Sequence, residues 1–344
     1  MRHMAISKVA PLAHALLALT VLVMLTACTS GKPVETPAAM QAVTLQLQWF
    51  PQAQFAGYYV ALEKGWYAEE GLDVTVRAGG PDISPATAVA GGNADFGTYM
   101  LADLASAVQQ GQALISIAQI QQQNGLLLLA LKSSGIDDPT DFVGKRVGVW
   151  LGSWDAQFRA LMTQQSLSDN QYQLVSQGFS MDAFLAGDLD VASAMIYNEY
   201  HVVLESGVAA NDLNIIDYAD YGLDFPGDTL FTTKELVEQN PDLCVRMLRA
   251  SLRGWEYAVA NPEEAADIVL KYDVTGTQTR EHQLSMMREV ALLVKSSDIR
   301  PLGYTDRADV LRVVDTLQRY GVLASPVQPD EVYTNTIWES ATSD

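Results

Sequence analysis

From Val43 onward, short apolar runs alternate with longer stretches in which apolar residues recur every three to four positions. The short runs predict strands and the longer stretches predict helices. The predicted strands are Val43–Trp49, Leu72–Val76, Ala94–Gly97, Leu114–Gln119, Gly125–Leu131, Arg146–Trp150, Tyr172–Val175, Val191–Ile196, Leu213–Asp217 and Thr229–Thr232. The helical patterns between them include Gln54–Glu70, Leu101–Gln110, Asp155–Gln165 and Met181–Ala186. Strands that alternate with helices predict βαβ units and mainly parallel sheets.

After about residue 233 the pattern is almost entirely helical. The predicted helices are Lys234–Gln239, Pro241–Ala260, Pro262–Tyr272, Thr279–Lys295, Asp306–Tyr320 and Pro329–Glu339. Pro241 and Pro262 stand where a first helical turn begins, which is the helical position that tolerates proline.

Two α/β segments followed by a helical segment predict two α/β lobes, with a chain that crosses between them twice. We expect these hinge crossovers in the extended stretches Leu129–Ser133 and Thr229–Thr233. Lobe 1 then comprises residues 43–130 and 234–344, and lobe 2 comprises residues 134–228. Because ligands of open parallel sheets bind beyond the carboxyl ends of the strands, we expect the ligand in the cleft between the lobes.

The N-terminus has the layout of a secretory signal. Arg2, His3 and Lys8 precede an apolar run that extends from residue 9 to residue 27. The run ends in Leu-Thr-Ala followed by Cys28, which resembles a bacterial lipoprotein signal with a lipidated cysteine. We therefore expect a signal peptide over residues 1–27 and a flexible tether over residues 28–42. The protein is then exported to the periplasmic or extracellular face and anchored in the membrane by lipid only. An uncleaved membrane helix is the alternative.

The charge balance excludes nucleic acid as a partner. The 344 residues include 21 Lys plus Arg and 41 Asp plus Glu, so the formal net charge is −20, whereas nucleic-acid binding relies on clustered cations. Loss of Arg2 and Lys8 with the signal shifts the charge to −22. Two cysteines are too few for a disulfide framework or a thiolate zinc site. With Cys28 as an anchor, we expect Cys244 to be a buried core thiol.

No motif points to an enzyme. The chain has no Gly-x-Ser-x-Gly, no phosphate-binding Gly-x-x-x-x-Gly-Lys-Ser/Thr, no His-Glu-x-x-His and no Cys-x-x-Cys. His201 and His282 fall in helical patterns, where surface or core positions are favoured over a catalytic base. We expect no catalytic residue, no metal and no cofactor.

Aromatic and amide residues gather where the predicted strands end. The candidate ligand-binding residues are Trp49, Gln54, Tyr58, Tyr99, Trp150, Trp154, Asn198 and Glu199. Aromatic faces with a few polar groups suit a flat ligand with polar edges. The alternatives are core positions for Trp49, Tyr58 and one of the Trp150/Trp154 pair, and helix N-terminal capping or an exposed position for Gln54. A fully buried Glu199 without a partner is unfavourable, so we expect ligand contact there, against charge placement at a helix start.

Four segments carry a family resemblance. The run from Trp49 to Val74 resembles the opening of ABC-importer substrate-binding proteins of the thiamine-precursor-binding type, as do residues 90–97, 143–149 and 194–200. The resemblance implies a periplasmic-binding-protein fold that closes by hinge motion, and an ABC permease with its ATPase as partners. It implies formylaminopyrimidine-type ligands, with riboflavin, alkylsulfonates or other small organics carried by relatives. The glutamate of the family's ligand site matches Glu199.

The same superfamily includes the fungal thiamine-pyrimidine synthase, which uses pyridoxal phosphate. By this resemblance its lysine position falls on Tyr99 and its donor histidine on Asp103. Its cysteine-rich stretch falls near residues 228–233, which contain no cysteine, and its phosphate loop falls on residues 151–155. These departures argue against pyridoxal phosphate chemistry. A sensory ligand-binding lipoprotein without a transporter is a further alternative.

We therefore predict a monomeric solute receptor for a small nitrogenous heteroaromatic. The ring stacks on Trp49 and on Tyr99, Trp150 or Trp154, while Asn198 and Glu199 bind its polar edge. An aminopyrimidine suits such a carboxylate, because it presents an amino group and a ring nitrogen side by side.

Overall fold

The computed structural model describes residue 1 and residues 40–152, 154–294 and 300–343. Met40–Asp344 form one compact unit. The predicted signal peptide, Cys28 and nearly all of the predicted tether lie outside the described residues. In the part of the chain that is described, no helix has the length and apolar character needed to cross a membrane.

The first lobe contains a five-stranded sheet in the order β2-β1-β3-β10-β4. Its strands are β1 (Gln41–Gln46), β2 (Leu72–Arg77), β3 (Phe96–Met100), β4 (Leu114–Gln119) and β10 (Asp228–Thr233). β1 is parallel to β2 and β3, whereas β10 is antiparallel to β3 and β4. Every residue of β4 is buried, as expected for a strand that is covered on both faces.

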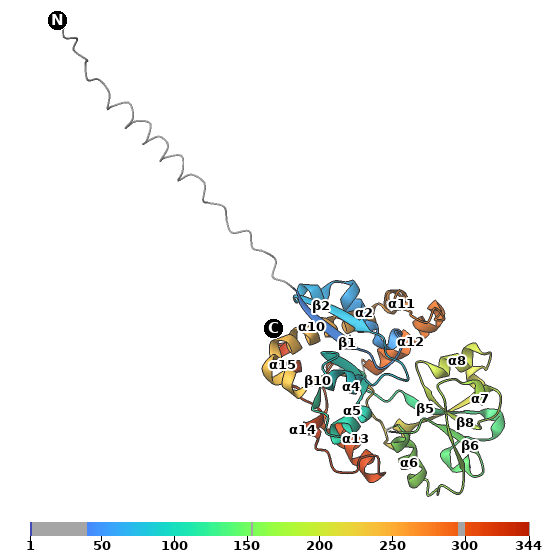
Figure 1. The fold of residues 1–344 in the computed structure, drawn as a ribbon. Helices are drawn as coiled ribbons and strands as arrows, with labels where there is room; N and C mark the ends of the chain where they lie inside the picture. The colour runs from blue at the N-terminus through green and yellow to red at the C-terminus, as the bar shows by residue number, and fades with distance from the viewer. Residues whose placement is uncertain (2–39, 153, 295–299, 344) are drawn as a thin grey trace. The chain divides into compact units, whose positions relative to one another are not determined.

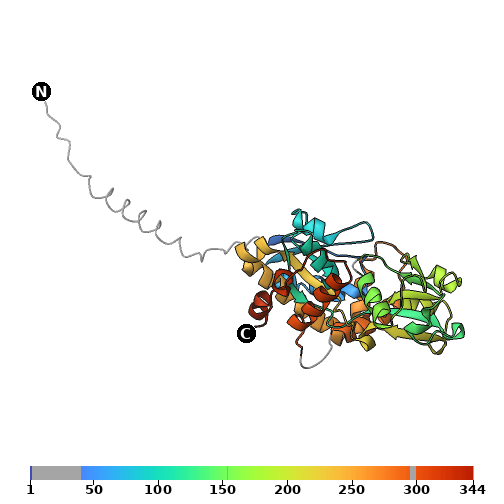
Figure 2. The ribbon, with the colours of Figure 1, turned by 90° about the horizontal axis from the view of Figure 1, so that it is seen from below.

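The second lobe contains another five-stranded sheet, in the order β7-β6-β8-β5-β9. Its strands are β5 (Leu126–Leu131), β6 (Arg146–Val149), β7 (Gln173–Ser176), β8 (Val191–Met195) and β9 (Leu213–Asp217). β6 is parallel to β7 and β8, whereas β5 is antiparallel to β8 and β9. Figures 1 and 2 show the two lobes side by side.

The strand pairings correct two sequence-based expectations. The sheets are mixed rather than mainly parallel, because β5 and β10 each begin where the chain arrives from the other lobe and therefore run against their neighbours. The chain crosses between β4 and β5, and again between β9 and β10, rather than at Leu129–Ser133 and Thr229–Thr233. These two stretches overlap β5 and β10, whose apolar residues are buried inside the sheets. The expected lobe boundaries at residues 130 and 228 shift accordingly.

Helices cover both faces of each sheet (Figure 1). Lobe 1 has η1 (Ala53–Phe55), α2 (Ala56–Glu63), α3 (Trp66–Glu69), α4 (Pro85–Ala90) and α5 (Leu101–Gln109). Lobe 2 has η2 (Lys132–Ser134), η3 (Pro139–Phe142), α6 (Asp155–Gln164), α7 (Asp182–Leu185), α8 (Glu199–Glu205), η4 (Ala210–Asp212) and η5 (Tyr218–Tyr221). The chain then returns to lobe 1 as α9 (Lys234–Gln239), α10 (Pro241–Ala260), α11 (Pro262–Leu270), α12 (Arg280–Val294), α13 (Arg307–Arg319), α14 (Pro329–Val332) and α15 (Thr336–Thr342).

Local chemistry explains several helix starts. The Asn240 side chain accepts from the backbone N–H of Leu243, and Pro241 occupies the first turn of α10, so one of the orphan amides of that turn is satisfied. The Thr233 and Asp306 side chains cap α9 and α13 in the same way.

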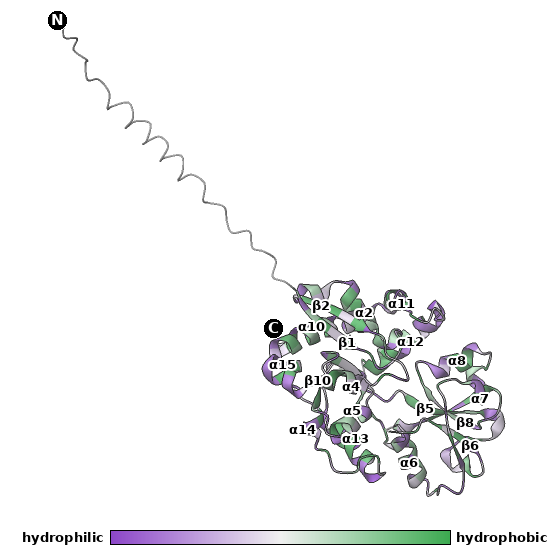
Figure 3. Cartoon of the chain, viewed as in Figure 1, coloured by the Kyte–Doolittle hydropathy of each residue, from purple (hydrophilic) through white to green (hydrophobic). Residues whose placement is uncertain are grey.

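The core of lobe 1 depends on a close approach of α2 and α10. A Cβ atom on Gly254 would lie 2.0 Å from the carbonyl oxygen of Gly57, and one on Gly57 would lie 2.2 Å from the ring of Trp255. Cys244, on α10, is fully buried, so the prediction of a buried thiol is confirmed. Figure 3 shows the apolar strands inside each lobe and hydrophilic residues toward its surface.

Candidate functional site

A cavity of about 270 Å³ lies between the two lobes. Residues from both lobes line it, at the ends of β1, β3, β6 and β8 and in the loops that follow β2 and β7. The lining residues are Gln48, Trp49, Gln52, Gln54, Gly80, Pro81, Ile83, Tyr99, Asp103, Trp150, Leu151, Gly152, Trp154, Phe179, Met195, Tyr197, Asn198 and Glu199. A cleft at the carboxyl ends of strands follows from the α/β topology.

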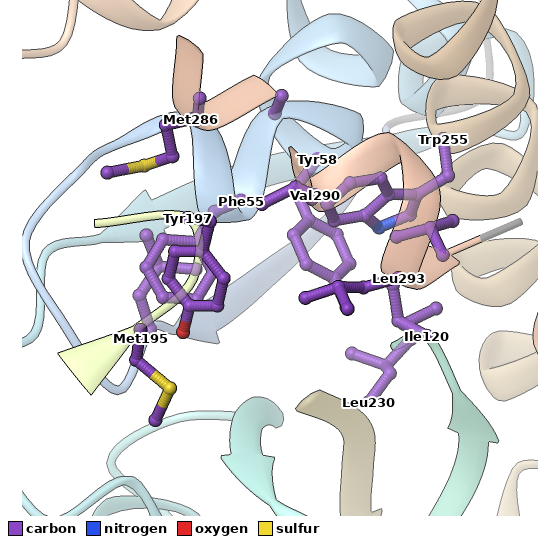
Figure 4. Close-up of a cluster of buried hydrophobic side chains, with 14 of the residues drawn as sticks. Phe55, Tyr58, Ile120, Met195, Tyr197, Leu230, Trp255, Met286, Val290 and Leu293 are labelled. Atoms are coloured by element: carbon purple, nitrogen blue, oxygen red, sulfur yellow. The ribbon is translucent and has the colours of Figure 1, made fainter. Parts of the chain in front are cut away.

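The structure brings seven of the eight candidate ligand-binding residues to this cavity, and Tyr58 is the exception. Tyr58 is 1% exposed and packs edge-on against Trp255, with ring centroids 5.7 Å apart. Figure 4 shows it within a cluster of buried apolar side chains. Because α2 turns this side chain toward α10, the core alternative applies to Tyr58. Trp49 and both Trp150 and Trp154 line the cavity.

The lobe 1 wall contains a chain of side-chain amides that ends on a buried carboxyl group. Gln52 Nε2 donates to Gln54 Oε1 at 2.7 Å, and Gln54 Nε2 donates to both oxygens of Asp228 at 2.9 and 3.1 Å. Gln48 Nε2 donates to Asp228 Oδ1 at 2.6 Å. Asp228 therefore fixes which way two cavity-lining amides point.

Burial controls the ionisation of Asp228, which is only 2% exposed. Burial raises its pKa from 3.8 to about 7, against the lowering effect of the Gln54 and Gln48 hydrogen bonds. Asp103 lies nearby and opposes ionisation further. The folded protein thus favours a proton on this group at acid pH.

The lobe 2 wall presents Asn198 and Glu199 at the start of α8. Glu199 is 6% exposed. Its Oε2 accepts from the backbone N–H of Met195 at 2.9 Å, and its Oε1 accepts from Asn198 Nδ2 at 2.8 Å. Burial raises the pKa of Glu199, while these hydrogen bonds oppose the rise. A carboxylate has about four acceptor positions, so each oxygen retains capacity for a ligand donor.

Aromatic rings from both lobes meet across the cavity. Trp49 of lobe 1 packs edge-on against Phe179 of lobe 2, with centroids 4.6 Å apart. Phe179 lies 6.0 Å from Trp150, and Trp150 lies 5.3 Å from Trp154. These rings give the cavity apolar walls for a flat ligand.

Trp154 also makes a polar contact between the lobes. Its Nε1–H donates to Asp103 Oδ2 at 2.7 Å. Burial raises the pKa of Asp103 to about 7, and the Trp154 hydrogen bond lowers it. Burial also raises the pKa of Tyr99 to about 12, so its hydroxyl group is neutral and able to donate.

The electrostatic character of the cavity is acidic. Asp103 and Glu199 line it, and the described lining residues include no lysine, arginine or histidine. No group of three or more His, Cys, Asp or Glu residues suited to a metal ion occurs in the described ranges.

Sequence reasoning missed several residues of this site. Gln48, Gln52, Phe179 and Tyr197 line the cavity, and Asp228 lies behind the amides. Gln48, Gln52 and Tyr197 lie at or near the ends of predicted strands, and this position could have identified them as candidates. Phe179 lies in the loop after β7 and is 49% exposed. No feature of the sequence pattern indicates that this loop residue borders a cavity.

The sequence is similar to a known family and to several characterised proteins. The family model described as "NMT1/THI5 like" matches residues 52–265. The chain is 28% identical to the riboflavin-binding protein RibY of Chloroflexus aurantiacus, over 93% of this chain and 95% of that protein. It is 26% identical to a formylaminopyrimidine-binding protein of Halalkalibacterium halodurans, over 86% and 91%. It is 30% identical to a 4-amino-5-hydroxymethyl-2-methylpyrimidine phosphate synthase of Legionella pneumophila, over 66% and 72%.

Solved structures share the architecture. The periplasmic aliphatic sulphonate binding protein SsuA of Escherichia coli matches with a TM-score of 0.67 and 14% identity, over 85% of this chain and 91% of that chain. The periplasmic nitrate-binding protein NrtA of Synechocystis matches with a TM-score of 0.66 and 13% identity, over 88% of both chains. Similarity at this level concerns the fold alone, and it confirms the predicted two-lobed periplasmic-binding-protein fold.

Proposed function

Because this chain belongs to the NMT1/THI5-like family, we propose that it is the solute-binding component of an ABC importer for a small nitrogenous heteroaromatic of the aminopyrimidine class. The observation that carries the proposal is the pairing of Glu199 and Asn198 with aromatic walls in one interlobe cavity. The formylaminopyrimidine-binding relative supports the ligand class.

The proposed ring lies between the aromatic side chains and presents one edge to lobe 2. An aminopyrimidine has an amino group beside a ring nitrogen, and a carboxyl group can accept from the first while sharing a proton with the second. Glu199 takes this role, and Asn198 supplies a further amide. The ring stacks on Trp49 and on Tyr99, Trp150 or Trp154, while Gln54 borders it from lobe 1.

The charge of the cavity favours a neutral or cationic ligand. Asp103 and Glu199 line it without a cation among the described lining residues. An ionised phosphate or sulfonate brought beside these carboxyl groups loses its hydration without gaining a counter-charge. Riboflavin, which is uncharged, remains a second candidate because of the RibY relative.

The enzymatic alternative has support from the Legionella pneumophila synthase relative, but the residues present do not fit pyridoxal phosphate. That group needs an amine for its aldehyde and donors or cations for its phosphate. The described lining residues include no lysine or arginine, and Asp103 would oppose a phosphate. We therefore derive no step through this cofactor.

Calorimetry with the purified full chain tests the function. The probes are 4-amino-5-hydroxymethyl-2-methylpyrimidine and its phosphate ester, with riboflavin as a third ligand. We expect the neutral pyrimidine to bind at least about tenfold more tightly than the phosphate, because the cavity is acidic. Tighter binding of the phosphate contradicts the proposal and favours the synthase class. Binding of riboflavin alone contradicts the pyrimidine assignment.

Glu199→Gln tests the assigned polar contact. The new amide group places a donor opposite either the Met195 N–H or the Asn198 Nδ2, so it removes an acceptor from the ligand edge. We expect the affinity to fall by about 1–3 kcal/mol, measured by the same calorimetry. Glu238→Gln, on the exposed surface of α9, is the matched control and leaves the affinity unchanged. An unchanged affinity in Glu199→Gln shows that the assigned contact is wrong.

The localisation and the partners of the protein are also proposals. We propose an exported monomer, anchored by a lipid on Cys28, that delivers its ligand to a permease driven by an ATPase. The mass of the mature N-terminal peptide tests the anchor. A peptide that begins before residue 28 contradicts it. A neighbouring receptor-kinase gene in place of permease and ATPase genes would favour the sensory alternative.

A further inference from the structure

Two histidine–glutamate contacts join the lobes beside the cavity. α12 of lobe 1 packs against α8 of lobe 2. His282 on α12 places Nδ1 3.0 Å from Glu205 Oε1 on α8. In the reciprocal contact, His201 on α8 places Nε2 3.7 Å from Glu289 Oε1 on α12. These are the two histidines that remain once the predicted signal is removed.

Of the two histidines, only His282 contacts a residue that lines the cavity, as far as the described residues show. The other ring nitrogen of His282, Nε2, lies 2.9 Å from Asn198 Oδ1. Asn198 Nδ2 in turn donates to Glu199 Oε1 at 2.8 Å. A continuous chain of contacts therefore runs from Glu205 near the surface through His282 and Asn198 to the buried carboxyl group of Glu199.

This series of contacts determines which of its atoms can donate a hydrogen bond. The Asn198 amide nitrogen faces the Glu199 oxygen, so the amide oxygen of Asn198 faces His282. An Asn198 amide turned the other way would place its oxygen against that carboxylate. His282 therefore lies between two acceptors, the Asn198 oxygen and the Glu205 carboxylate. A neutral imidazole has one N–H and can donate to only one of them, whereas an imidazolium has two.

We propose that His282, carrying a proton on both ring nitrogens, is a positioning residue that bridges the lobes and orients Asn198 and Glu199 for the ligand. The inference rests on the proposed ligand site. Loss of the proton breaks one of the two hydrogen bonds of His282, which leaves the Asn198 amide free to turn. A His282 ring that can donate to only one of these acceptors therefore weakens ligand binding at this wall.

Among the described residues, Glu205 is the carboxylate that contacts the His282 ring. The other titratable groups on α8 are Tyr200, His201 and Glu199. His201 faces Glu289 on α12, and Glu199 is linked to His282 only through Asn198. η1 contributes no titratable group to the packing against α12. On α11, Asp267 pairs with Arg280 of α12.

The remaining charges near α12 have partners or point to solvent. On α10, Arg249 and Arg253 pair with Glu70 and Glu69, and Arg246 pairs with Asp242 of its own helix. Glu256 of α10, Glu263 of α11, and Glu281 and Arg288 of α12 are exposed, and no ion pair or hydrogen bond of the described residues joins them to the His282 ring.

The first test compares His282→Gln with His282→Ala in the full chain, by calorimetry with 4-amino-5-hydroxymethyl-2-methylpyrimidine. Glutamine keeps an N–H donor for Asn198 that does not titrate, and alanine has none. At about pH 6 we expect a roughly tenfold loss of affinity for His282→Ala and less than about threefold for His282→Gln. Rescue by glutamine separates positioning from a general loss of packing.

The pH profile sharpens the comparison. The ratio of the glutamine variant's affinity to the wild-type affinity is higher at alkaline pH than at acid pH, because only the wild type has a proton to lose at position 282. Titration of Asp103, Asp228 and Glu199 affects both proteins and cancels in this ratio. His201→Gln is the matched control, since its pair lies on the same two helices without touching the cavity. A constant ratio, or an equal effect of His201→Gln, overturns the proposal.

A ligand-free measurement separates this inference from the proposed function. Nitrogen NMR of the full chain labelled at histidine reports the protonation of each ring nitrogen, and the His282→Gln spectrum assigns the signal. Because the ring lies between two acceptors, we expect both nitrogens of His282 to be protonated under the conditions of the first binding test. A neutral single tautomer under those conditions overturns the proposal. If the pyrimidine binds to none of the proteins, the proposed function fails, while the NMR result still decides the state of His282.

Discussion

The two halves of the cavity are built in different ways. The lobe 1 half contains a buried hydrogen-bond network, in which Gln52, Gln54 and Asp228 are each no more than 6% exposed. Beside Asn198 and Glu199, the lobe 2 half presents a group of aromatic rings, of which Phe179 is 49% exposed. Buried polar groups are costly unless every partner is in place, whereas aromatic faces tolerate partial exposure. The polar part is therefore held by its own hydrogen bonds, whereas the aromatic part leaves more side-chain surface exposed.

Replacement of Asp228 by leucine tests this difference most strongly. Asp228→Leu removes the acceptor of the Gln54 and Gln48 amides, which leaves two donors unpaired in a confined site. At about pH 5, where the carboxyl group is mainly neutral, we expect the free energy of unfolding in urea to fall by about 2–4 kcal/mol. On the opposite wall, Phe179→Ala changes it by less than about 1 kcal/mol, because half of that side chain is already exposed.

Asp73→Leu serves as a control for the change in chemistry, because Asp73 lies on an exposed position of β2 in the same lobe. It leaves the free energy of unfolding within about 0.5 kcal/mol of the wild type. If Asp228→Leu is as mild as Phe179→Ala, the two halves do not differ in the way described.

The pH dependence of stability gives a second test of the polar half. The folded protein binds a proton at Asp228 up to about pH 7, whereas the ordinary pKa of the group is 3.8. The contribution of this group to stability is therefore fully present below about pH 4 and is lost as the pH rises to about 7. A shift of about three units corresponds to roughly 4 kcal/mol, and the hydrogen bonds that asparagine cannot accept offset part of it.

We therefore expect Asp228→Asn to raise the free energy of unfolding by about 1–3 kcal/mol at pH 8 and to change it little near pH 4. Urea titrations at the two pH values provide the measurement, and Asp73→Asn is the control with no pH-dependent difference. A gain that is equal at both pH values, or present only at pH 4, rules out a proton held on Asp228.

Much of the fold follows from periodicity, but the position of the crossings does not. An unbroken apolar run predicts the strand Gly125–Leu131, which corresponds to β5 (Leu126–Leu131), and such a run is typical of a strand covered on both faces. The run does not say which sheet receives the strand. That depends on pairing with β8 and β9, which lie more than 60 residues later in the chain. The mixed character of both sheets escaped prediction for the same reason.

The site shows the same limit at the level of single side chains. Trp49 and Tyr58 are both aromatic, lie near the end of the same predicted strand, and both have a core position as the alternative to ligand contact. Their different positions depend on α10, which is almost 200 residues away and packs Trp255 against Tyr58. Asp228 carries no motif, and its importance arises only because Gln48 and Gln54 converge on it.

The two indole rings of lobe 2 allow a finer comparison within the aromatic half. Trp150 and Trp154 both line the cavity, but their N–H groups have different partners. Trp150 Nε1 donates at 3.0 Å to the carbonyl oxygen of Gly178, within lobe 2. Trp154 Nε1 donates at 2.7 Å to Asp103 Oδ2, in lobe 1. Phenylalanine keeps an aromatic face at either position and removes only the donor and part of the ring area.

Trp154→Phe therefore removes a hydrogen bond between the lobes, and we expect the affinity for the proposed pyrimidine to fall by about three- to tenfold, as for the loss of one hydrogen bond to a charged or partly charged group. Trp150→Phe lowers the free energy of unfolding by about 0.5–1.5 kcal/mol and leaves the affinity within about twofold, because its hydrogen bond does not join the lobes. Calorimetry and urea unfolding on both variants provide the measurements. Equal losses of affinity would mean that the rings act only through their area, since the contact between Trp154 and Asp103 is then irrelevant to closure.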